Sequence, residues 1–158
     1  APTTASDRSE LYRFVQEVRR FYPFFPVVAA RNWKVFSWRN IRFPAGRRFL
    51  LDLHATNTDP CLWNEPETFN PERFRKEDFS AFALIPQGGG DVSKNHRCPG
   101  ETVVLEVMER ALRMLLCEME YRLPAQNLRI DRSRMPALPV SKIILADIRR
   151  SERSLKET

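Results

Sequence analysis

The chain has 158 residues, of which 42% are apolar, and this is enough for one domain, residues 1–158, with a hydrophobic core. It carries 26 lysines and arginines against 20 aspartates and glutamates, a net charge of +6. The arginine pairs, such as Arg47-Arg48, have acidic residues a few positions away. We therefore expect dispersed charge on a solvated surface, which argues against a nucleic-acid partner.

Three cysteines without Cys-x-x-Cys spacing argue against a disulfide framework and a zinc finger, and they favour a reducing compartment. No apolar run approaches the roughly 18 residues that a membrane span needs, and the N-terminus lacks the features of a signal peptide. We therefore expect a cytoplasmic protein without a membrane span. Because the chain starts at Ala1 and not at a methionine, we also expect a segment of a longer protein.

The first third of the chain is predicted to contain one helix and a set of short strands. Apolar residues at helical spacing predict a helix over residues 7–22, which two prolines follow. β-branched and aromatic residues, with turn signals such as Arg39-Asn40 between them, predict antiparallel strands in the region 27–54. A short helix is expected near residues 51–58.

Residues 59–98 show no sustained period of either kind, and such a long irregular stretch in a compact domain is usually functional. We expect a meander that ends in a cysteine loop. Its apolar side chains favour an ordered coil wrapped on the core over a disordered linker: Leu62, Trp63, Phe69, Phe74, Phe79, Phe82, Leu84 and Ile85.

A strong helical period follows this coil. Apolar residues form one wide face over residues 99–121 and predict a long, well-buried helix. Pro99 is expected to be its first residue, which places Cys98 at the N-cap.

Beyond this helix, strands near 127–131 and 143–146 are expected to pair as a hairpin within residues 127–148. The charged tail 149–158 is expected to fray. Together the elements predict an α+β fold that is mainly α, with small antiparallel β hairpins and a long irregular cysteine loop before a long buried helix.

A cysteine at the N-terminus of a long helix is well placed to be a thiolate, because the helix dipole and unpaired N–H groups lower the thiol pKa. Beside Cys98, the side chains of His96 and Arg97 add positive or hydrogen-bonding character. Gly100 has no side chain, so a flat group could approach the backbone closely. An inert buried cysteine is the alternative.

Other arrangements of cysteine and histidine are weaker. Cys61 lies between a proline and a leucine, and Cys117 lies within the predicted helix. A cysteine hydrolase with His54 or His96 as its base is possible, but His96 is only two residues from Cys98 and His54 has no visible orienting partner. A zinc site at His96 and Cys98 lacks two further nearby ligands.

Two charged patterns lie upstream. Glu17 and Arg20 lie on one side of the first predicted helix, nearly opposite its apolar stripe, so the period alone predicts a surface ion pair worth a few tenths of a kcal/mol. Arg73, in the sequence Pro-Glu-Arg-Phe, stands in the irregular stretch with no local reason to be there.

In this order, the segments 17–20 (Glu-Val-Arg-Arg), 71–74 (Pro-Glu-Arg-Phe) and 96–100 (His-Arg-Cys-Pro-Gly) resemble the three C-terminal signatures of the cytochrome P450 superfamily. The resemblance implies the C-terminal, haem-binding part of that fold. It also implies a buried triad of Glu17, Arg20 and Arg73, in conflict with the surface pair, and we adopt the buried triad.

By the same resemblance, Cys98 is the axial thiolate ligand of the iron of haem b. Thiolate ligation raises electron density on the iron and favours O–O cleavage. The resemblance further implies that the surrounding loop binds the cofactor through Gln87, Gly88, His96, Arg97, Cys98 and Gly100.

One branch of the superfamily is matched in more detail. The segment 85–90 (Ile-Pro-Gln-Gly-Gly-Gly) and the lengthened loop to Cys98 resemble the hydrogen-peroxide-dependent fatty-acid hydroxylases, or fatty-acid peroxygenases. The usual Phe, Gly and Arg of the cysteine loop are replaced by Asp91, Lys94 and His96. The resemblance implies substrate contacts at the segment 24–25, that is Phe24 and Phe25.

The expected activity of the full-length protein is hydroxylation of a fatty acid at the α or β carbon with hydrogen peroxide. The missing N-terminal part of the fold should carry the other side of the haem site, so we expect this segment alone to be inactive. The alternatives are a monooxygenase that a ferredoxin or flavoprotein reductase supplies with electrons, an inactive haem-binding fragment, and a basic, haem-free interaction domain.

Overall fold

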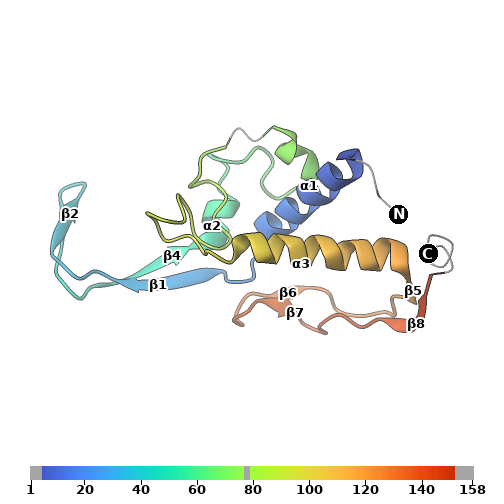
Figure 1. Ribbon diagram of the computed structural model, residues 1–158. Helices are drawn as coiled ribbons and strands as arrows, with labels where there is room; N and C mark the ends of the chain where they lie inside the picture. Colours follow the sequence, from blue (N-terminus) through green and yellow to red (C-terminus); the bar gives the residue numbers. More distant parts are fainter. Residues whose placement is uncertain (1–4, 77–78, 152–158) are drawn as a thin grey trace.

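The computed structural model describes residues 5–76 and 79–151 (Figure 1). The elements, in chain order, are α1 (Ala5–Phe21), β1 (Val27–Arg31), β2 (Phe36–Trp38), β3 (Ile41–Phe43), β4 (Arg48–Asp52), α2 (Leu53–Asn57), the 3-10 helix η1 (Pro71–Arg75), α3 (Glu101–Arg113), the π-helical turn η2 (Met114–Glu118), β5 (Met119–Arg122), β6 (Ile130–Asp131), β7 (Leu138–Pro139) and β8 (Ala146–Arg150). Helices combined with small antiparallel sheets confirm the predicted α+β class. Within the described ranges, no helix has both the length and the hydropathy to cross a bilayer.

The strands between α1 and α2 form a projecting arm, which we define as residues 27–52. β1 pairs with β4 and β2 with β3, all antiparallel, as the sequence predicts. Arg39 and Asn40 both have positive φ, 45° and 63°, which is the backbone of a tight hairpin turn. Figure 1 shows the arm extending to one side of the remaining structure.

The irregular segment after the arm is an ordered coil, as expected, and it folds on a small aromatic core. Trp63, Phe74 and Leu84 are buried together, and the Trp63 and Phe74 ring centroids lie 5.9 Å apart. The expectation of burial is wrong for Leu62 and Phe82, whose side chains are exposed. Apolar composition alone does not tell which side of an irregular coil faces the core.

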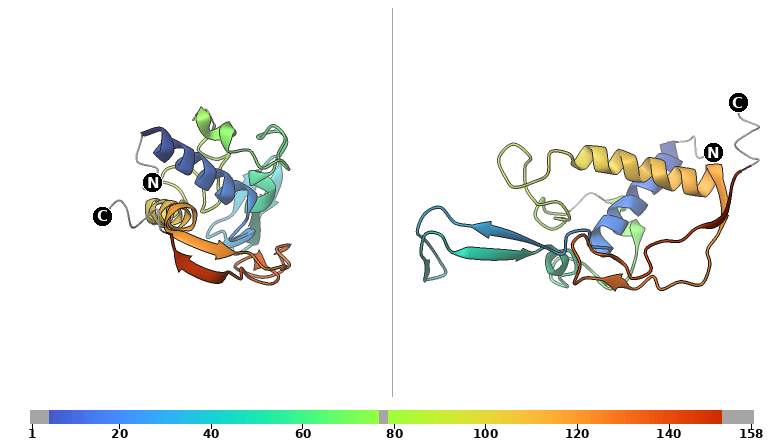
Figure 2. Two further views of the ribbon diagram at one scale, coloured as in Figure 1. Left: turned by 90° about the vertical axis from the view of Figure 1, so that its right-hand side faces the viewer. Right: turned by 90° about the horizontal axis from the view of Figure 1, so that it is seen from below.

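The helix that follows Cys98 is shorter and less buried than predicted. α3 ends at Arg113, a π-helical turn follows, and residues 119–122 form strand β5. Gly100, and not Cys98, is the N-cap residue. Val103 and Val107 are more than 60% exposed, because α1 and the C-terminal strands cover only part of the wide apolar face (Figure 2).

The predicted strand pairing of the C-terminal hairpin is wrong. β6 pairs with β7, so that Ile130 faces Pro139, and the run 143–145 forms no strand. The side chain of Gln126 instead holds the backbone of Ile144, at 2.8 Å from the amide nitrogen and 3.0 Å from the carbonyl oxygen. A side-chain amide therefore replaces the expected strand ladder there.

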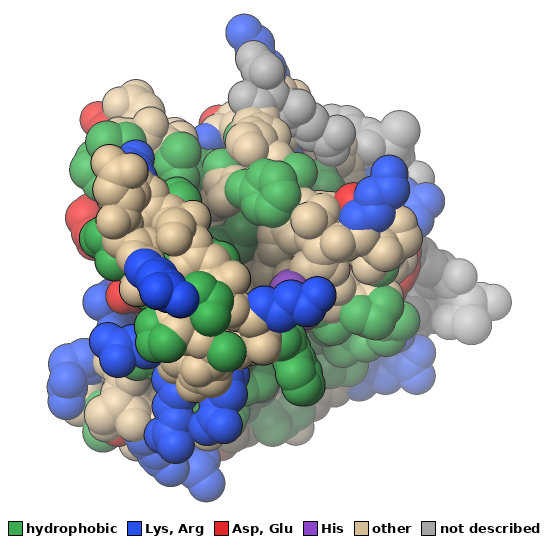
Figure 3. Space-filling model, turned by 90° about the vertical axis from the view of Figure 1, so that its left-hand side faces the viewer, with side chains coloured by type: hydrophobic (Ala, Val, Ile, Leu, Met, Phe, Trp, Pro, Cys, Tyr) green, Lys and Arg blue, Asp and Glu red, His purple; other side chains and the backbone are tan. Residues whose placement is uncertain are grey.

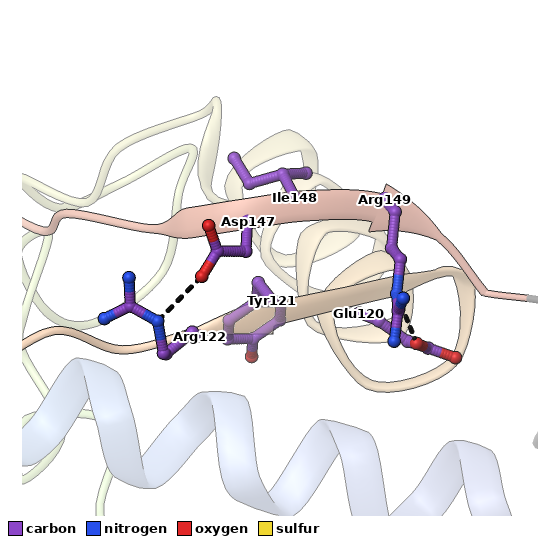
Figure 4. A pocket seen from close by; sticks show the side chains of 6 residues that line it. All are labelled: Glu120, Tyr121, Arg122, Asp147, Ile148 and Arg149. Atoms are coloured by element: carbon purple, nitrogen blue, oxygen red, sulfur yellow. Dashed lines mark hydrogen bonds and ion pairs between the residues drawn. The ribbon is translucent and has the colours of Figure 1, made fainter.

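The start of the predicted frayed tail is part of a sheet. β8 pairs with β5, and cross-strand ion pairs join Arg149 to Glu120 at 2.8 Å and Arg122 to Asp147 at 2.7 Å (Figure 4). Opposite charges on the two facing strands stabilise this pairing. The sequence pattern of the tail did not predict it, because the charged residues of β8 find their partners in β5. The rest of the predicted tail, residues 152–158, lies outside the described residues.

Candidate functional site

Glu17 and Arg20 of α1 are fully buried, each with 0% exposed surface. Glu17 accepts hydrogen bonds from Arg20 Nε at 2.7 Å and Arg20 Nη2 at 2.8 Å, and from Arg73 Nε at 3.3 Å. The surface ion pair that the helical period predicts is therefore wrong. η1 and the coil before it cover the polar side of α1, and this covering brings the three residues together.

The two arginines of this triad also bind backbone. Arg20 donates to the carbonyl oxygens of residues 57, 66 and 68, and Arg73 donates to those of residues 64, 65 and 68. Glu17 further accepts from the amide of Asn70 at 2.8 Å. Coil carbonyls lack strand or helix partners, so the triad supplies donors that buried backbone requires. It thereby fixes the coil 57–73 on α1.

The cysteine loop holds Cys98 immediately before α3. Cys98 is a free cysteine, half-buried, whose amide donates to the Gln87 carbonyl at 3.0 Å and whose carbonyl accepts from the Glu101 amide at 3.2 Å. Gly88 and Arg97 form an isolated antiparallel bridge beside it. These contacts hold the beginning of the loop, at Gln87 and Gly88, against its end at Arg97 and Cys98.

Gly88 is required at its position for two reasons. Its φ is +93°, and a Cβ there would lie 1.9 Å from the carbonyl oxygen of His96. Gly46, in the arm, also has a positive φ of +78°, but a Cβ there would meet nothing within 4 Å.

We expect Gly88→Ala to lower the free energy of unfolding by about 3 kcal/mol, because backbone strain and a backbone clash add. Gly46→Ala should cost about 1 kcal/mol, since it carries the strain alone. Urea unfolding of both variants checks this difference. Equal losses would show that the loop shifts freely to admit a side chain.

A second buried ion cluster lies beside the cysteine. Glu101, 8% exposed, pairs with Arg19 of α1 and with Arg97 of the loop. Arg19 also donates to the side-chain oxygen of Gln87 at 3.0 Å, and Arg97 donates to the carbonyl of Gly90 at 3.2 Å. The cluster therefore joins α1, the glycine-rich segment and the start of α3 around Cys98.

Burial tends to raise the pKa of Glu101, but hydrogen bonds from Arg97 and Arg19 outweigh it and hold the pKa below the usual glutamate value. Since the folded pKa is the lower one, the cluster stabilises the fold above the unfolded pKa. That contribution is lost as pH falls through the folded pKa.

We expect Glu101→Gln to cost about 2 kcal/mol of unfolding free energy at neutral pH, because two arginines lose their charged partner. The stability difference from wild type should shrink on acidification below the folded pKa. Urea unfolding over a pH series measures both quantities. A difference that does not change with pH would show that the carboxylate charge is not what stabilises this cluster.

An apolar cavity of about 830 Å³ opens next to the loop. Gln87 of the cysteine loop and Phe24 and Phe25 beyond α1 all line it. The Phe24 and Phe25 ring centroids lie 4.7 Å apart, and the Phe24 carbonyl accepts from the amide of Ala137 at 2.9 Å. The C-terminal hairpin is thereby attached beside the two rings. Further lining residues are Val18, Tyr22, Val104, Met108, Ile130 and Ile143.

The remaining candidates lie apart from this arrangement. Cys61 is exposed in the coil, and Cys117 lies in the turn η2. Burial, then the charge of Arg132, lowers the pKa of His54, in α2. His96 is exposed at the surface of the loop. Over residues 5–76 and 79–151, no three His, Cys, Asp or Glu side chains gather as a metal-binding group.

The fold and this site define the chain's family. A family model described as Cytochrome P450 matches residues 6–145. The chain belongs to the cytochrome P450 family, whose members are haem-thiolate oxidoreductases with haem as cofactor.

Curated relatives are similar over most of this chain. Cytochrome P450 71A8 of Mentha piperita is 30% identical over 138 residues, covering 82% of this chain and 26% of its own length. The bifunctional protein STORR of Papaver somniferum is 28% identical over 149 residues, covering 90% of this chain and 16% of its own length. The chain thus spans about a quarter or less of the length of these relatives.

Solved structures are more similar still. Cytochrome P450SP alpha (CYP152B1) in complex with (R)-ibuprofen has a TM-score of 0.82 and 48% identity, covering 94% of this chain and 36% of that one. Cytochrome P450EX alpha (CYP152N1) with myristic acid has a TM-score of 0.82 and 43% identity, and the match covers 93% of this chain and 38% of that one. A variant of cytochrome P450 OleT with arachidonic acid has a TM-score of 0.80 and 37% identity, and the match covers 92% of this chain and 35% of that one.

The residues around Cys98 fit haem. The thiol is free and not fully buried, so its sulfur is available as a ligand. A Cβ added at Gly100 would lie 3.7 Å from that sulfur, so the glycine leaves the space beside it open.

Sequence reasoning did not assign a role to Glu101, Arg19 or Asn57. Asn57 is 1% exposed, and its side chain accepts from the amide of Ile85 at 2.9 Å, which fixes the start of the cysteine loop. An acidic residue three positions after the cysteine, with an arginine directly before the cysteine, is a sequence signal that was available for the Glu101 cluster but was not used.

Proposed function

We propose that the full-length protein is a hydrogen-peroxide-dependent fatty-acid hydroxylase and that Cys98 is the axial ligand of its haem iron. The observation that carries this proposal is the free, half-buried Cys98, held before α3 by Gln87 and Glu101. The similarity to cytochromes P450SP alpha, P450EX alpha and OleT supports this branch of the family.

The haem, when bound, supplies the chemistry that transfers a peroxide oxygen to a C–H bond, so that R–H and H₂O₂ give R–OH and water. The chain's own residues hold it. Cys98 provides the thiolate, while Gln87 and Gly88 shape the loop around the sulfur, and Gly100 leaves space beside it. The Glu101 cluster keeps the loop in register with α1.

The resemblance to cytochromes P450 also suggests His96 or Arg97 as the contact of a haem propionate, and these two residues differ in their surroundings. Arg97 already donates to Glu101 and to the carbonyl of Gly90, so its Nε and Nη1 are occupied. His96 is exposed. We therefore retain His96 as the candidate propionate contact and assign Arg97 first to the loop.

Phe24 and Phe25 are the proposed substrate contacts. Their rings pack edge to face and line the apolar cavity, and both remain partly exposed. An apolar wall of this kind suits an acyl chain, which binds by burial of its methylene groups. Two of the similar solved structures contain fatty acids, myristic and arachidonic acid.

The second candidate is a monooxygenase that receives electrons from a ferredoxin or flavoprotein reductase. The similarity to plant cytochromes P450 such as 71A8 supports this second candidate, because that similarity extends over most of the chain.

The deciding experiment uses the haem-loaded full-length protein with myristic acid. We expect hydroxymyristate with hydrogen peroxide alone, and its loss when catalase is added. The control is the Cys98→Ser variant under the same conditions. Product that forms only when a reductase and ferredoxin supply electrons would overturn the peroxide proposal in favour of the second candidate.

A further inference from the structure

Arg19 of α1 is a buried cation. Figure 3 shows many lysine and arginine side chains at the surface of the face that carries the arm. Arg19 differs from them, because only 5% of this residue is exposed. Any residues that a longer protein packs around this segment can only increase its burial. A buried positive charge requires acceptors around it, so the identity of these acceptors shows what the side chain does.

The acceptors of Arg19 come from three parts of the chain. Its Nη1 donates to the side-chain oxygen of Gln16 in the same helix. Its Nη2 donates to the side-chain oxygen of Gln87 at 3.0 Å and also to the carboxylate of Glu101. A guanidinium nitrogen of this kind carries two hydrogens, so Nη2 can make both contacts at once. One nitrogen atom therefore joins the glycine-rich segment to the start of α3.

The same two residues hold Cys98 through their backbones. The amide of Cys98 donates to the carbonyl of Gln87 at 3.0 Å, and its carbonyl accepts from the amide of Glu101 at 3.2 Å. The backbones of Gln87 and Glu101 thus meet at Cys98, and their side chains meet at Arg19. These contacts form a closed ring. Rotation of either peptide group of Cys98 would move Gln87 or Glu101 against a buried guanidinium.

We propose that Arg19 is a positioning residue for Cys98. It holds the peptide groups on both sides of the cysteine and thereby keeps the thiolate directed at the haem iron. Residues that orient a metal ligand commonly affect metal affinity or activity roughly 10- to 100-fold when they are replaced. The proposal rests on Cys98 as the haem ligand, and it is the same whether peroxide or a reductase drives the enzyme.

The test uses the haem-loaded full-length protein and its Arg19→Met variant, reduced under carbon monoxide. The measurement is the rate at which the red-shifted Soret band converts to the unshifted band at fixed temperature and pH. We expect conversion roughly tenfold faster in the variant, because a loosely held sulfur leaves the iron more readily. The reduction potential of the haem should rise as well, since weaker thiolate donation favours the oxidised iron less.

Arg13→Met is the matched control. It removes the same charge from the same helix, but Arg13 contacts the side chains of Ser9 at 3.1 Å and Glu72 at 3.4 Å, which are not part of the cysteine loop. The rate of band conversion and the reduction potential should both stay at their wild-type values.

Arg19→Lys separates positioning from charge compensation. A lysine keeps the positive charge beside Glu101 but lacks the planar fork that reaches several acceptors at once. We expect this variant to keep most of the free energy of unfolding in urea and still to convert faster than wild type. Because it keeps the charge, it also makes the test decisive if Arg19→Met does not fold.

Amide hydrogen exchange of the peptide 88–100, measured by mass spectrometry, reports the loop directly. Exchange should be faster in Arg19→Met and unchanged in Arg13→Met. Wild-type conversion, potential and exchange in Arg19→Met or in Arg19→Lys would overturn the proposal, as would equal changes in Arg13→Met. If Cys98→Ser loses the band and Arg19→Met behaves as wild type, only the positioning role fails. If Cys98→Ser keeps the band, the ligand assignment fails with it.

Discussion

Cys98→Ser is expected to abolish the red-shifted Soret band of the reduced, carbon-monoxide-bound protein. That band reports thiolate ligation of the haem iron, and a serine hydroxyl would not supply thiolate donation. The absorption spectrum of the haem-loaded wild type and variant is the measurement. Peroxide-dependent hydroxylation should be lost with the band.

Cys117→Ser provides the matched control, because Cys117 is also free and half-buried but lies in the turn η2. It should keep the band unchanged. A band that persists in Cys98→Ser would refute the ligand assignment. If the 158-residue chain takes up no haem, the same comparison in the full-length protein separates a missing haem wall from a wrong assignment.

The largest loss of stability is expected for Glu17→Gln. The variant leaves Arg20, fully buried, and Arg73 without the carboxylate that both contact. Removal of one partner from a buried ion cluster costs about 3–5 kcal/mol, because an uncompensated charge remains. Urea unfolding monitored by circular dichroism measures this difference.

Glu72→Gln controls for the loss of one glutamate charge. Glu72 pairs with Arg75 at 2.5 Å and with Arg13 at 3.4 Å, but its side chain is 53% exposed. Solvent screens such pairs, so we expect no measurable change in stability. A similar loss in both variants would argue that net charge, and not the buried triad, determines the effect.

The sequence predicts best the location of the local elements. α1 and the antiparallel strands of the arm lie close to their predicted ranges. The helical period predicted the wrong surroundings for Glu17 and Arg20. It tells which face of a helix is polar, but it does not tell whether that face is covered by water or by an irregular coil. Only the order of the three motifs predicted burial there.

Long-range pairing was the least predictable feature. The apolar residues around Leu115 and Met119 continue a helical period, yet residues 119–122 pair with a strand about 30 positions later in the chain. Likewise, the contact between Arg19 and Glu101 joins residues 82 positions apart. Local sequence patterns hold no information about such distant partners. The motif therefore located Cys98, whereas the ion cluster of Glu101 beside it became visible only in the structure.

The attachment of the coil to α1 has a consequence for how this segment can vary. Arg20 and Arg73 bind carbonyl oxygens of residues 57, 64, 65, 66 and 68, a group that every amino acid carries. Substitutions at exposed positions such as Asn64 and Glu67 therefore leave the anchoring atoms in place. The sequence of the coil can therefore change at these positions while its backbone path is kept, because Arg20 and Arg73 fix that path through the carbonyl groups.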